Sequence, residues 1–281
     1  MHSELQYLLA LEKILQEGIK TPSRTGINCY VYPHIILSFD FKEGFPLFTH
    51  KKMAVHTFKV ELEGFIKGIT DKKWYQERKC HIWDEWCNPQ KVPYAHDEET
   101  KKKMFFENDL GKIYGYQWRN FNSSGYDQLQ KIIQELKTNP YNRQLVCSAW
   151  NPLELHEQAL PPCHVLWHVF VTSDQRMHLS WFQRSADFPL GVPANVMSYA
   201  LLLHLLCKET GYKEGIVTGF FSNCHIYENQ VEGVLEAITR PIFPFPSVKT
   251  ENFTSIFDWK AEDTVFENYK CGEKIIFPIA V

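Results

Sequence analysis

The run VMSYALLLHLLCKETG, residues 196–211, is apolar around nearly its whole circumference. A surface helix keeps a polar face toward water, so a helix without such a face is typical of a protein interior. We therefore predict a buried helix that ends near Gly211. A chain of 281 residues with 44% hydrophobic residues is large enough to bury a full core around it.

Several segments that precede and follow this helix have the composition of strands. RQLVCSAW, HVLWHVFV and MHLSWFQRS are rich in valine, leucine and aromatic residues, and TSDQR between the last two predicts a hairpin. SRTGINCYVYPHIILSFDF and IVTGFFSNCHIY have the same character. A buried helix among such strands predicts a mixed α/β (α+β) fold.

Three further segments predict helices. In the first, Leu5, Leu8, Leu9 and Ile14 are predicted on one side of a helix that stops near Gly18. VHTFKVELEGFIKG predicts the second, and YDQLQKIIQELKTNP a third that ends by Pro140. The stretch 87–112 is polar and carries a charge run, which predicts a solvated surface insertion in one domain that spans residues 1–281.

Net charge and cysteine usage narrow the classes of function. A formal charge of −3 and a pI near 6.5 argue against a broad basic surface for a nucleic-acid duplex and favour a small anionic ligand. The eight cysteines are scattered without a CxxC pair, so they are expected to be mostly reduced thiols. No apolar run is long enough to span a bilayer, and the first residues do not resemble a secretion signal. A cytoplasmic location is expected, with no membrane partner.

Cys163 is a candidate nucleophile because Pro161 and Pro162 fix the backbone ahead of a predicted strand, and Arg184 follows the hairpin at its far end. A nearby cation would favour the thiolate. Three other interpretations compete with this one. The thiol can be a small buried hydrophobe, the nucleophile of a Cys-His hydrolase, or a zinc ligand. Zinc is disfavoured because His164 and His168, placed on one face of a strand, lie about 13 Å apart.

QRSADFPLGVPAN combines several types of polar side chain within thirteen residues. Arg184 and Ser185 can donate to a phosphate, Asp187 can only accept when ionised, and Asn195 can do both. Turn and capping roles explain each residue equally well. For Asn195, which precedes the predicted buried helix, an N-cap is the competing interpretation.

Eight motifs follow one another along nearly the whole chain, in the order SRTG, EGFPLFTHKK, HIWDEW, YGYQWR, SAWNPLELHEQALPPCH, FQRSADFPLGVPANVMSYALL, CHIYEN and FPIAV. They resemble the motifs of the thymidylate synthase family and of the related pyrimidine nucleotide hydroxymethylases. The resemblance implies a thymidylate-synthase-like fold with a mixed sheet packed with helices. It also implies a homodimer in which the two sheets pack face to face.

The same resemblance implies how the reaction is started. Cys163 resembles the nucleophile that adds to C6 of the pyrimidine and makes C5 electron-rich. Glu61 and Tyr114 resemble the carboxylate that handles protons and the tyrosine that takes part in proton abstraction. The C5 carbon would then take a one-carbon unit from 5,10-methylenetetrahydrofolate, a co-substrate, with no metal involved.

Ligand-binding residues are also implied by the resemblance. The expected nucleotide ligands are Arg24, Gln183, Arg184, Ser185, Asn195, His225 and Tyr227. Arg143 is expected to reach across the dimer into the partner's site. The expected folate contacts are Ile82, Trp83, Asp187, Leu190, Gly191 and Val281, the last through a terminal carboxylate on a tail that acts as a lid.

Asn195 indicates which base is bound. An amide can accept a hydrogen bond from N3–H of uracil and donate one to O4, whereas cytosine presents an unprotonated N3 and an amino donor. Members of the family that act on cytosine nucleotides carry Asp here. Asn195 therefore favours dUMP.

The sequence departs from the synthase pattern at four places. Gln144 replaces a second arginine, Ala194 replaces a phenylalanine, and Phe221-Ser222-Asn223 replaces Gly-Gly-Asp. Leu62-Glu63-Gly64 replaces Leu-Leu-Trp, and Glu63 resembles an acidic residue of a cytosine-specific hydroxymethylase.

These departures concern the last step, in which C5 gains either hydride, to give methyl, or water, to give hydroxymethyl. The added volume at Ala194 and a water-orienting Glu63 would favour water, unless a larger neighbour fills the volume and Glu63 faces solvent. Trp83, Asp187 and the FPIAV tail suit closure over folate, so conversion of dUMP to dTMP is the predicted activity. A dUMP hydroxymethylase is the first alternative. A Cys-dependent hydrolase and a catalytically silent nucleotide-binding relative are the remote ones.

Overall fold

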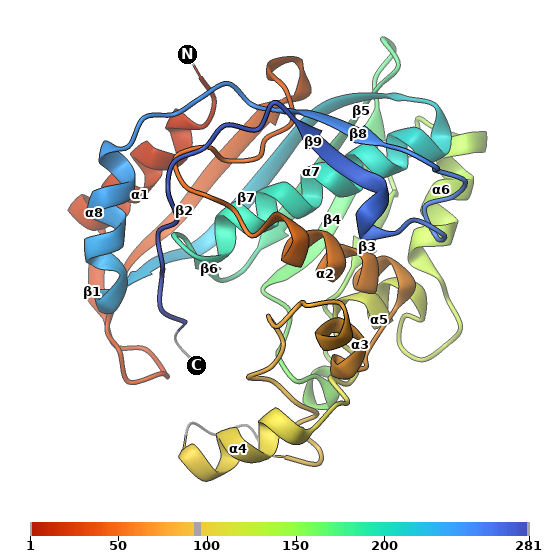
Figure 1. Ribbon diagram of the computed structural model, residues 1–281. Helices are drawn as coiled ribbons and strands as arrows, with labels where there is room; N and C mark the ends of the chain where they lie inside the picture. The colour runs from red at the N-terminus through yellow and green to blue at the C-terminus, as the bar shows by residue number, and fades with distance from the viewer. Residues whose placement is uncertain (1, 93–96, 280–281) are drawn as a thin grey trace.

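The computed structural model describes residues 2–92 and 97–279, so Val281 and part of the predicted insertion lie outside the described residues (Figure 1). The helices of the described part are α1 (Leu5–Glu17), α2 (Val55–Lys67), α3 (Lys72–Glu77), α4 (Glu98–Phe106), α5 (Tyr114–Arg119), α6 (Gln128–Thr138), α7 (Gly191–Thr210) and α8 (Val231–Thr239). Short 3-10 turns are η1 (Phe41–Glu43), η2 (Leu155–Glu157), η3 (Glu228–Gln230) and η4 (Ala261–Asp263).

A mixed sheet forms the centre of the fold. Its strands are β1 (Ile19–Thr21), β2 (Cys29–Asp40), β3 (Val146–Ser148), β4 (His164–Val171), β5 (Arg176–Gln183), β6 (Ala186–Asp187) and β7 (Lys213–Tyr227). They lie in the order β1-β2-β7-β5-β4-β3, with β6 beside β7. β5 and β6 run parallel to β7, whereas the other pairs are antiparallel. A separate ladder joins β8 (Ser247–Thr250) to β9 (Thr264–Glu267). The predicted fold class and the β4–β5 hairpin are confirmed.

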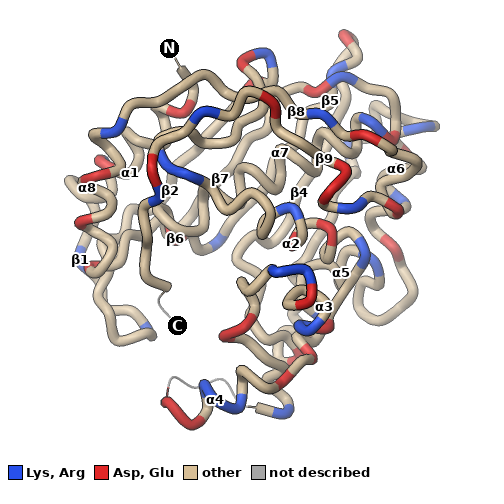
Figure 2. Tube along the Cα trace, in the orientation of Figure 1, with Lys and Arg blue, Asp and Glu red and all other residues tan. Residues whose placement is uncertain are grey.

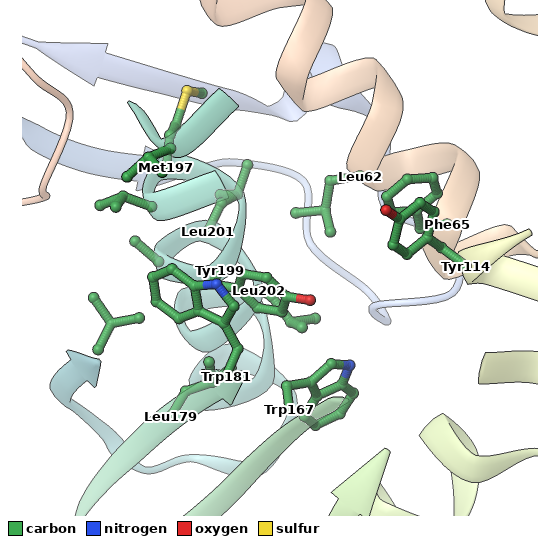
Figure 3. Close-up of a cluster of buried hydrophobic side chains, with 14 of the residues drawn as sticks. Leu62, Phe65, Tyr114, Trp167, Leu179, Trp181, Met197, Tyr199, Leu201 and Leu202 are labelled. Atoms are coloured by element: carbon green, nitrogen blue, oxygen red, sulfur yellow. The ribbon is translucent and has the colours of Figure 1, made fainter. Parts of the chain in front are cut away.

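Helix α7 is buried as predicted and lies across one face of the sheet (Figure 1). Its side chains pack on those of β4 and β5 (Figure 3), and the Tyr199 ring stacks on Trp181 with centroids 4.8 Å apart. Trp167 from β4 meets Trp118 of α5 edge to face at 5.7 Å. Burial of each such large apolar side chain stabilises the fold by roughly 1.5–3 kcal/mol. The helix ends at Gly211, whose φ of +84° suits glycine at this left-handed position.

Two details of the helices differ from the predictions. Leu9 is 52% exposed, because α1 turns Tyr7, Leu8 and Leu11 inward instead. Helix α7 begins at Gly191 and not after Asn195, so the N-cap interpretation of Asn195 is wrong. Local composition favoured a turn over FPLGVPAN, but proline is tolerated in the first turn of a helix, where backbone N–H groups lack intrahelical partners.

The prediction that His164 and His168 share one face of β4 is wrong. The pairing of β4 with β5 shifts register between His164 and Leu166, which is the signature of a bulge. One extra residue reverses the alternation of side chains. His164 consequently contacts Tyr199 on the α7 side, whereas His168 stacks with Phe170 on the other side.

Surface charges of both signs are interspersed along the chain (Figure 2). The charge run on α4 is largely exposed, as predicted for a solvated segment. In the described part, no helix combines the length and the apolar character needed to cross a membrane.

The segment that leads to α4 is held by a buried lysine. Lys72 Nζ donates to the carbonyl oxygens of Met104 at 2.6 Å, Trp86 at 3.0 Å and Asp84 at 3.3 Å. Burial lowers the pKa of this amine. Three carbonyls from one segment therefore converge on a single ammonium group.

Replacing Lys72 with methionine is expected to loosen residues 84–107, because three buried carbonyls lose their donor. The free energy of unfolding should fall by about 2–3 kcal/mol, and amide hydrogen exchange should accelerate within this segment. Lys73→Met, at an exposed position of the same helix, is the control. Equal exchange in the two variants would contradict the assignment.

Candidate active site

A cavity of about 310 Å³ lies where α2, α7, β7 and the segment before β4 meet. The predicted site residues that line it are Arg24, Glu61, Ile82, Trp83, Tyr114, Cys163, Gln183, Ser185, Asp187, Leu190, Gly191, Asn195, His225 and Tyr227. They come from segments far apart in the chain. The fold thus brings residues chosen from separate motifs to one cavity.

Two predicted residues are placed differently, and a third is not described. Arg184 lines an adjoining cavity that it shares with Arg24, Cys163 and Ser185. Arg143 is exposed in the segment between α6 and β3 and is not among the residues that line either cavity. Val281 lies outside the described residues.

Cys163 lies directly before β4, and hydrogen bonds to Tyr114 and Arg184 fix its backbone. Its N–H donates to Tyr114 Oη at 2.7 Å, and its carbonyl accepts from Arg184 N–H at 2.8 Å. The Arg184 guanidinium donates to the carbonyls of Pro161 and Pro162, each at 2.9 Å. The arginine is therefore held beside the thiol by the proline pair.

The predicted effect of this cation on the thiol is outweighed. Burial raises the pKa of Cys163, and the charges of Arg184 and Arg24 together with the Tyr114 hydroxyl oppose the rise without reversing it. Desolvation penalises the thiolate more than two nearby cations stabilise it.

Glu61 and Tyr114 lie close together because α2 and α5 approach closely. A Cβ on Gly115 would stand 2.5 Å from the carbonyl oxygen of Phe65, so only glycine permits this contact. Burial raises the pKa of Glu61 to about 7, although the Trp83 indole opposes the shift. Burial also raises the pKa of Tyr114. A carboxyl group that titrates near neutrality is suited to both accept and donate a proton.

His164 belongs to the cavity wall, although the sequence suggested it only as a metal ligand. Its ring stacks on Tyr114 at 4.2 Å, and Nδ1 is 2.7 Å from Tyr199 Oη. Burial lowers its pKa to about 3, so the imidazole is neutral. Other lining residues not singled out beforehand are Phe58, Trp86, Leu160 and Ile279. Trp86, Leu160 and Ile279 carried a signal, since they lie in the motifs HIWDEW, SAWNPLELHEQALPPCH and FPIAV, whereas Phe58 lies in none of the motifs.

Asn195 is oriented by a chain of amide contacts. Trp181 Nε1–H donates to Gln183 Oε1 at 3.3 Å, which turns Gln183 Nε2 toward Asn195 Oδ1 at 3.1 Å. Gln183 Nε2 also reaches the Ser185 carbonyl at 3.1 Å. This donor distinguishes the oxygen of the Asn195 amide from its nitrogen, and the NH₂ group remains available to donate to a ligand.

Asp187 and His225 are adjacent partners on β6 and β7. Burial raises the pKa of the Asp187 carboxyl, and His225 and Gln230 oppose the shift. His225 Nδ1 donates to the Asn223 carbonyl at 2.9 Å, which leaves Nε2 as the remaining polar atom of the ring. Asn223 has a φ of +47°, a conformation that asparagine adopts more readily than most residues. Phe221 and Ser222, which stand where the synthase pattern has glycines, are not among the residues with a positive φ, so this part of β7 does not require glycine.

Ala194 and Glu63, two departures from the synthase pattern that concern the final step, differ in their position relative to the cavity. Ala194 lines the cavity, as expected if a ring were missing from its wall. Glu63 is buried, and its carboxylate binds Lys67 Nζ at 2.5 Å and the backbone N–H of Ala261 at 2.9 Å. Both predictions for Glu63 are therefore wrong. It neither faces solvent nor lines the cavity, because it ties α2 to the η4 turn.

The zinc interpretation finds no support among the residues described. They contain no cluster of three histidine, cysteine or acidic side chains suited to a metal. The bulge in β4 also separates His164 from His168, as described above.

Comparison with known proteins identifies a single family. The family model described as thymidylate synthase matches residues 5–281. The chain is 37% identical to the thymidylate synthase of Mesoplasma florum, over 98% of this chain and 99% of the relative. It is 37% identical to that of Mycoplasma pneumoniae, with the same coverage. It is also 36% identical to a bifunctional dihydrofolate reductase-thymidylate synthase of Paramecium tetraurelia, where it spans 62% of the relative.

The raised pKa of Glu61 predicts a dependence of stability on pH. In the folded protein this carboxyl stays protonated up to about pH 7, whereas in the unfolded chain it ionises near its ordinary value of 4.5. Its contribution to stability is present below pH 4.5 and is lost as pH rises through 7. Glu61→Gln should therefore be more stable than the wild type by about 2–3 kcal/mol at pH 8 and equally stable at pH 4.

Urea unfolding from pH 4 to 9 measures this difference. Glu77→Gln, at an exposed position on α3, should track the wild type throughout. A constant offset between Glu61→Gln and the wild type would contradict the assignment.

Proposed function

Because the chain belongs to the thymidylate synthase family, we propose that it methylates C5 of dUMP with 5,10-methylenetetrahydrofolate as co-substrate. The observation that carries the proposal is the shared cavity. It holds a thiol, a base-reading amide and a carboxyl group that titrates near neutrality, beside two arginines.

The nucleotide is proposed to bind with its phosphate at Arg24, Arg184 and Ser185. Asn195 then faces the pyrimidine edge and accepts from N3–H while its NH₂ group donates to O4. His225 and Tyr227, which lie two residues apart on β7 and both line the cavity, are proposed to bind the sugar hydroxyl. In this orientation the ring lies over Cys163.

Cys163 is proposed to add to C6 and make C5 nucleophilic. Tyr114 is proposed to assist removal of the C5 proton, and Glu61 to relay protons at the carbonyl side of the ring. The co-substrate supplies both the one-carbon unit and the hydride. The side chains around its proposed position fit a flat heterocycle, since Ile82, Trp83 and Leu190 form an apolar wall and the Asp187 carboxylate accepts from ring N–H groups.

Methyl is the favoured product. Glu63, the residue that would direct water in a hydroxymethylase, is engaged by Lys67 and Ala261 outside the cavity. Ile279 of the C-terminal segment lines the cavity together with Trp83 and Leu190, so apolar groups surround the space where hydride transfer would occur.

The product of a single incubation tests this function. Wild-type protein with dUMP and methylenetetrahydrofolate should give dTMP and an equal amount of dihydrofolate, measured by mass spectrometry and absorbance. Cys163→Ala should lose at least about 10⁴-fold in activity and form no covalent adduct with 5-fluoro-dUMP. Hydroxymethyl-dUMP with tetrahydrofolate would contradict a synthase.

We also propose that the active unit is a homodimer that forms through the sheet face opposite α7. On that face Ile36 pairs with Phe220, and Phe220 with Phe182, in a row across β2, β7 and β5. These residues are 56%, 41% and 39% exposed. A contiguous row of exposed apolar side chains is typical of an interface. Packing of two such faces is proposed to carry Arg143 of each protomer to the phosphate side of its partner's site.

Mixing two inactive variants tests the role of Arg143. After co-refolding of Cys163→Ala with Arg143→Ala, half of the dimers should be mixed, and each mixed dimer holds one intact site. Activity should then recover to about a quarter of the wild-type value. If Arg143 acts in its own protomer, every site keeps one defect and activity stays at the level of the parents.

The proposed location is the cytoplasm. Each of the eight cysteines is a free thiol, and the proposed chemistry requires Cys163 to be reduced. Both observations suit a reducing compartment.

A further inference from the structure

Gln230 connects two parts of the site that are far apart in sequence. The side chain is 1% exposed and lies at the end of η3, just before α8. Its Nε2 donates to Asp187 Oδ2 at 3.1 Å and Oδ1 at 3.3 Å, and to the carbonyl of Pro278 at 3.1 Å. Both hydrogens of one amide are therefore shared between the cavity carboxylate and the C-terminal tail, residues 275–279.

The tail is seated on the body of the protein at two further points. Phe277 is buried, with its ring 4.4 Å from Lys51 Nζ and pressed against α8 at Gly233. Ile279 then lines the cavity. In Figure 1 the tail runs down past β6. A displacement of Pro278 would break a hydrogen bond to the same amide that holds Asp187.

We propose that Gln230 is a positioning residue that couples seating of the C-terminal tail to the orientation of the Asp187 carboxylate. The inference rests on the proposed function, because Asp187 is the residue placed against the folate ring. When the tail is seated, Pro278 orients the amide and the amide orients the carboxylate. Folate binding and tail closure then reinforce one another, since each stabilises the same arrangement of Gln230.

A purely structural role for Gln230 would use its other polar atom. Oε1 accepts from the Tyr227 N–H at 3.0 Å and so caps the η3 turn. Gln230→Glu keeps this acceptor and the size of the side chain, but it removes both donors and sets a carboxylate against Asp187. The substitution thus separates the coupling from the cap.

The first experiment measures tail seating without any reaction. Trypsin should cut after the exposed Lys274 only when the tail detaches, and mass spectrometry follows release of residues 275–281. Release should be about tenfold faster in Gln230→Glu. Glu232→Gln, an exposed position on α8, should match the wild type. Equal rates in Gln230→Glu and the wild type would overturn the proposal.

The second experiment is a double-mutant cycle on turnover. Gln230→Glu and deletion of residues 278–281 should each lower kcat about tenfold and raise the KM for folate, with the KM for dUMP unchanged within about twofold. The kcat of the combined variant should be no lower than that of the less active single variant, because both changes break the same linkage. Multiplication of the two losses would overturn the coupling.

Two further variants keep the test decisive. If Gln230→Glu does not fold, Gly233→Ala replaces it, since the added Cβ would lie 2.8 Å from Phe277 Cε1 and dislodge the tail. Faster tail release in Gly233→Ala with unchanged kcat and folate KM would overturn the proposal. If the wild type makes no dTMP, the proposed function fails separately. Tail release in Asp187→Ala then decides the coupling. If the coupling exists, release is faster in Asp187→Ala than in the wild type, and adding Gln230→Glu to Asp187→Ala does not make it faster still.

Discussion

The packing of α7 across the mixed sheet is the constraint on which the site depends. The helix follows β6 without a long connection, so its first turn opens at the same place where β5 and β7 end. Asn195 therefore projects from the helix toward Gln183 on the sheet. Because Tyr199 stacks on Trp181 one turn further along, a shift of the helix would move the Asn195 amide together with the core.

The packing of a buried helix on a sheet could be predicted from the sequence. The bulge in β4 and the position where α7 begins could not. The all-round apolar run predicted a buried helix, and the strand segments on both sides predicted a sheet beneath it. The bulge after His164 left no pattern, because one extra residue in a strand changes the register without changing composition. The start of α7 at Gly191 was also hidden, since glycine and proline favoured a turn by local propensity and burial of the helix outweighed it.

The candidate site shows a similar division. The motifs pointed to most of the residues that line the cavity, but their electrostatic state depends on burial in three dimensions. Arg184 next to Cys163 suggested a stabilised thiolate, yet desolvation raises the pKa of the thiol. The same effect holds Glu61 near neutrality. His164 was set aside as a metal ligand and became a neutral ring against Tyr114, a contact that requires the bulge.

The choice between hydride and water depends on how completely the cavity is enclosed. Ala194 leaves one wall without the ring that the synthase pattern carries, which by itself would admit solvent. Glu63 cannot direct that solvent, because its carboxylate is committed to Lys67 and Ala261. The remaining closure comes from the tail, where Phe277 anchors the segment and Ile279 faces the cavity. A chain that lacks the ring at position 194 must therefore depend more strongly on tail seating to exclude water, and Gln230 is the residue through which that seating reaches Asp187.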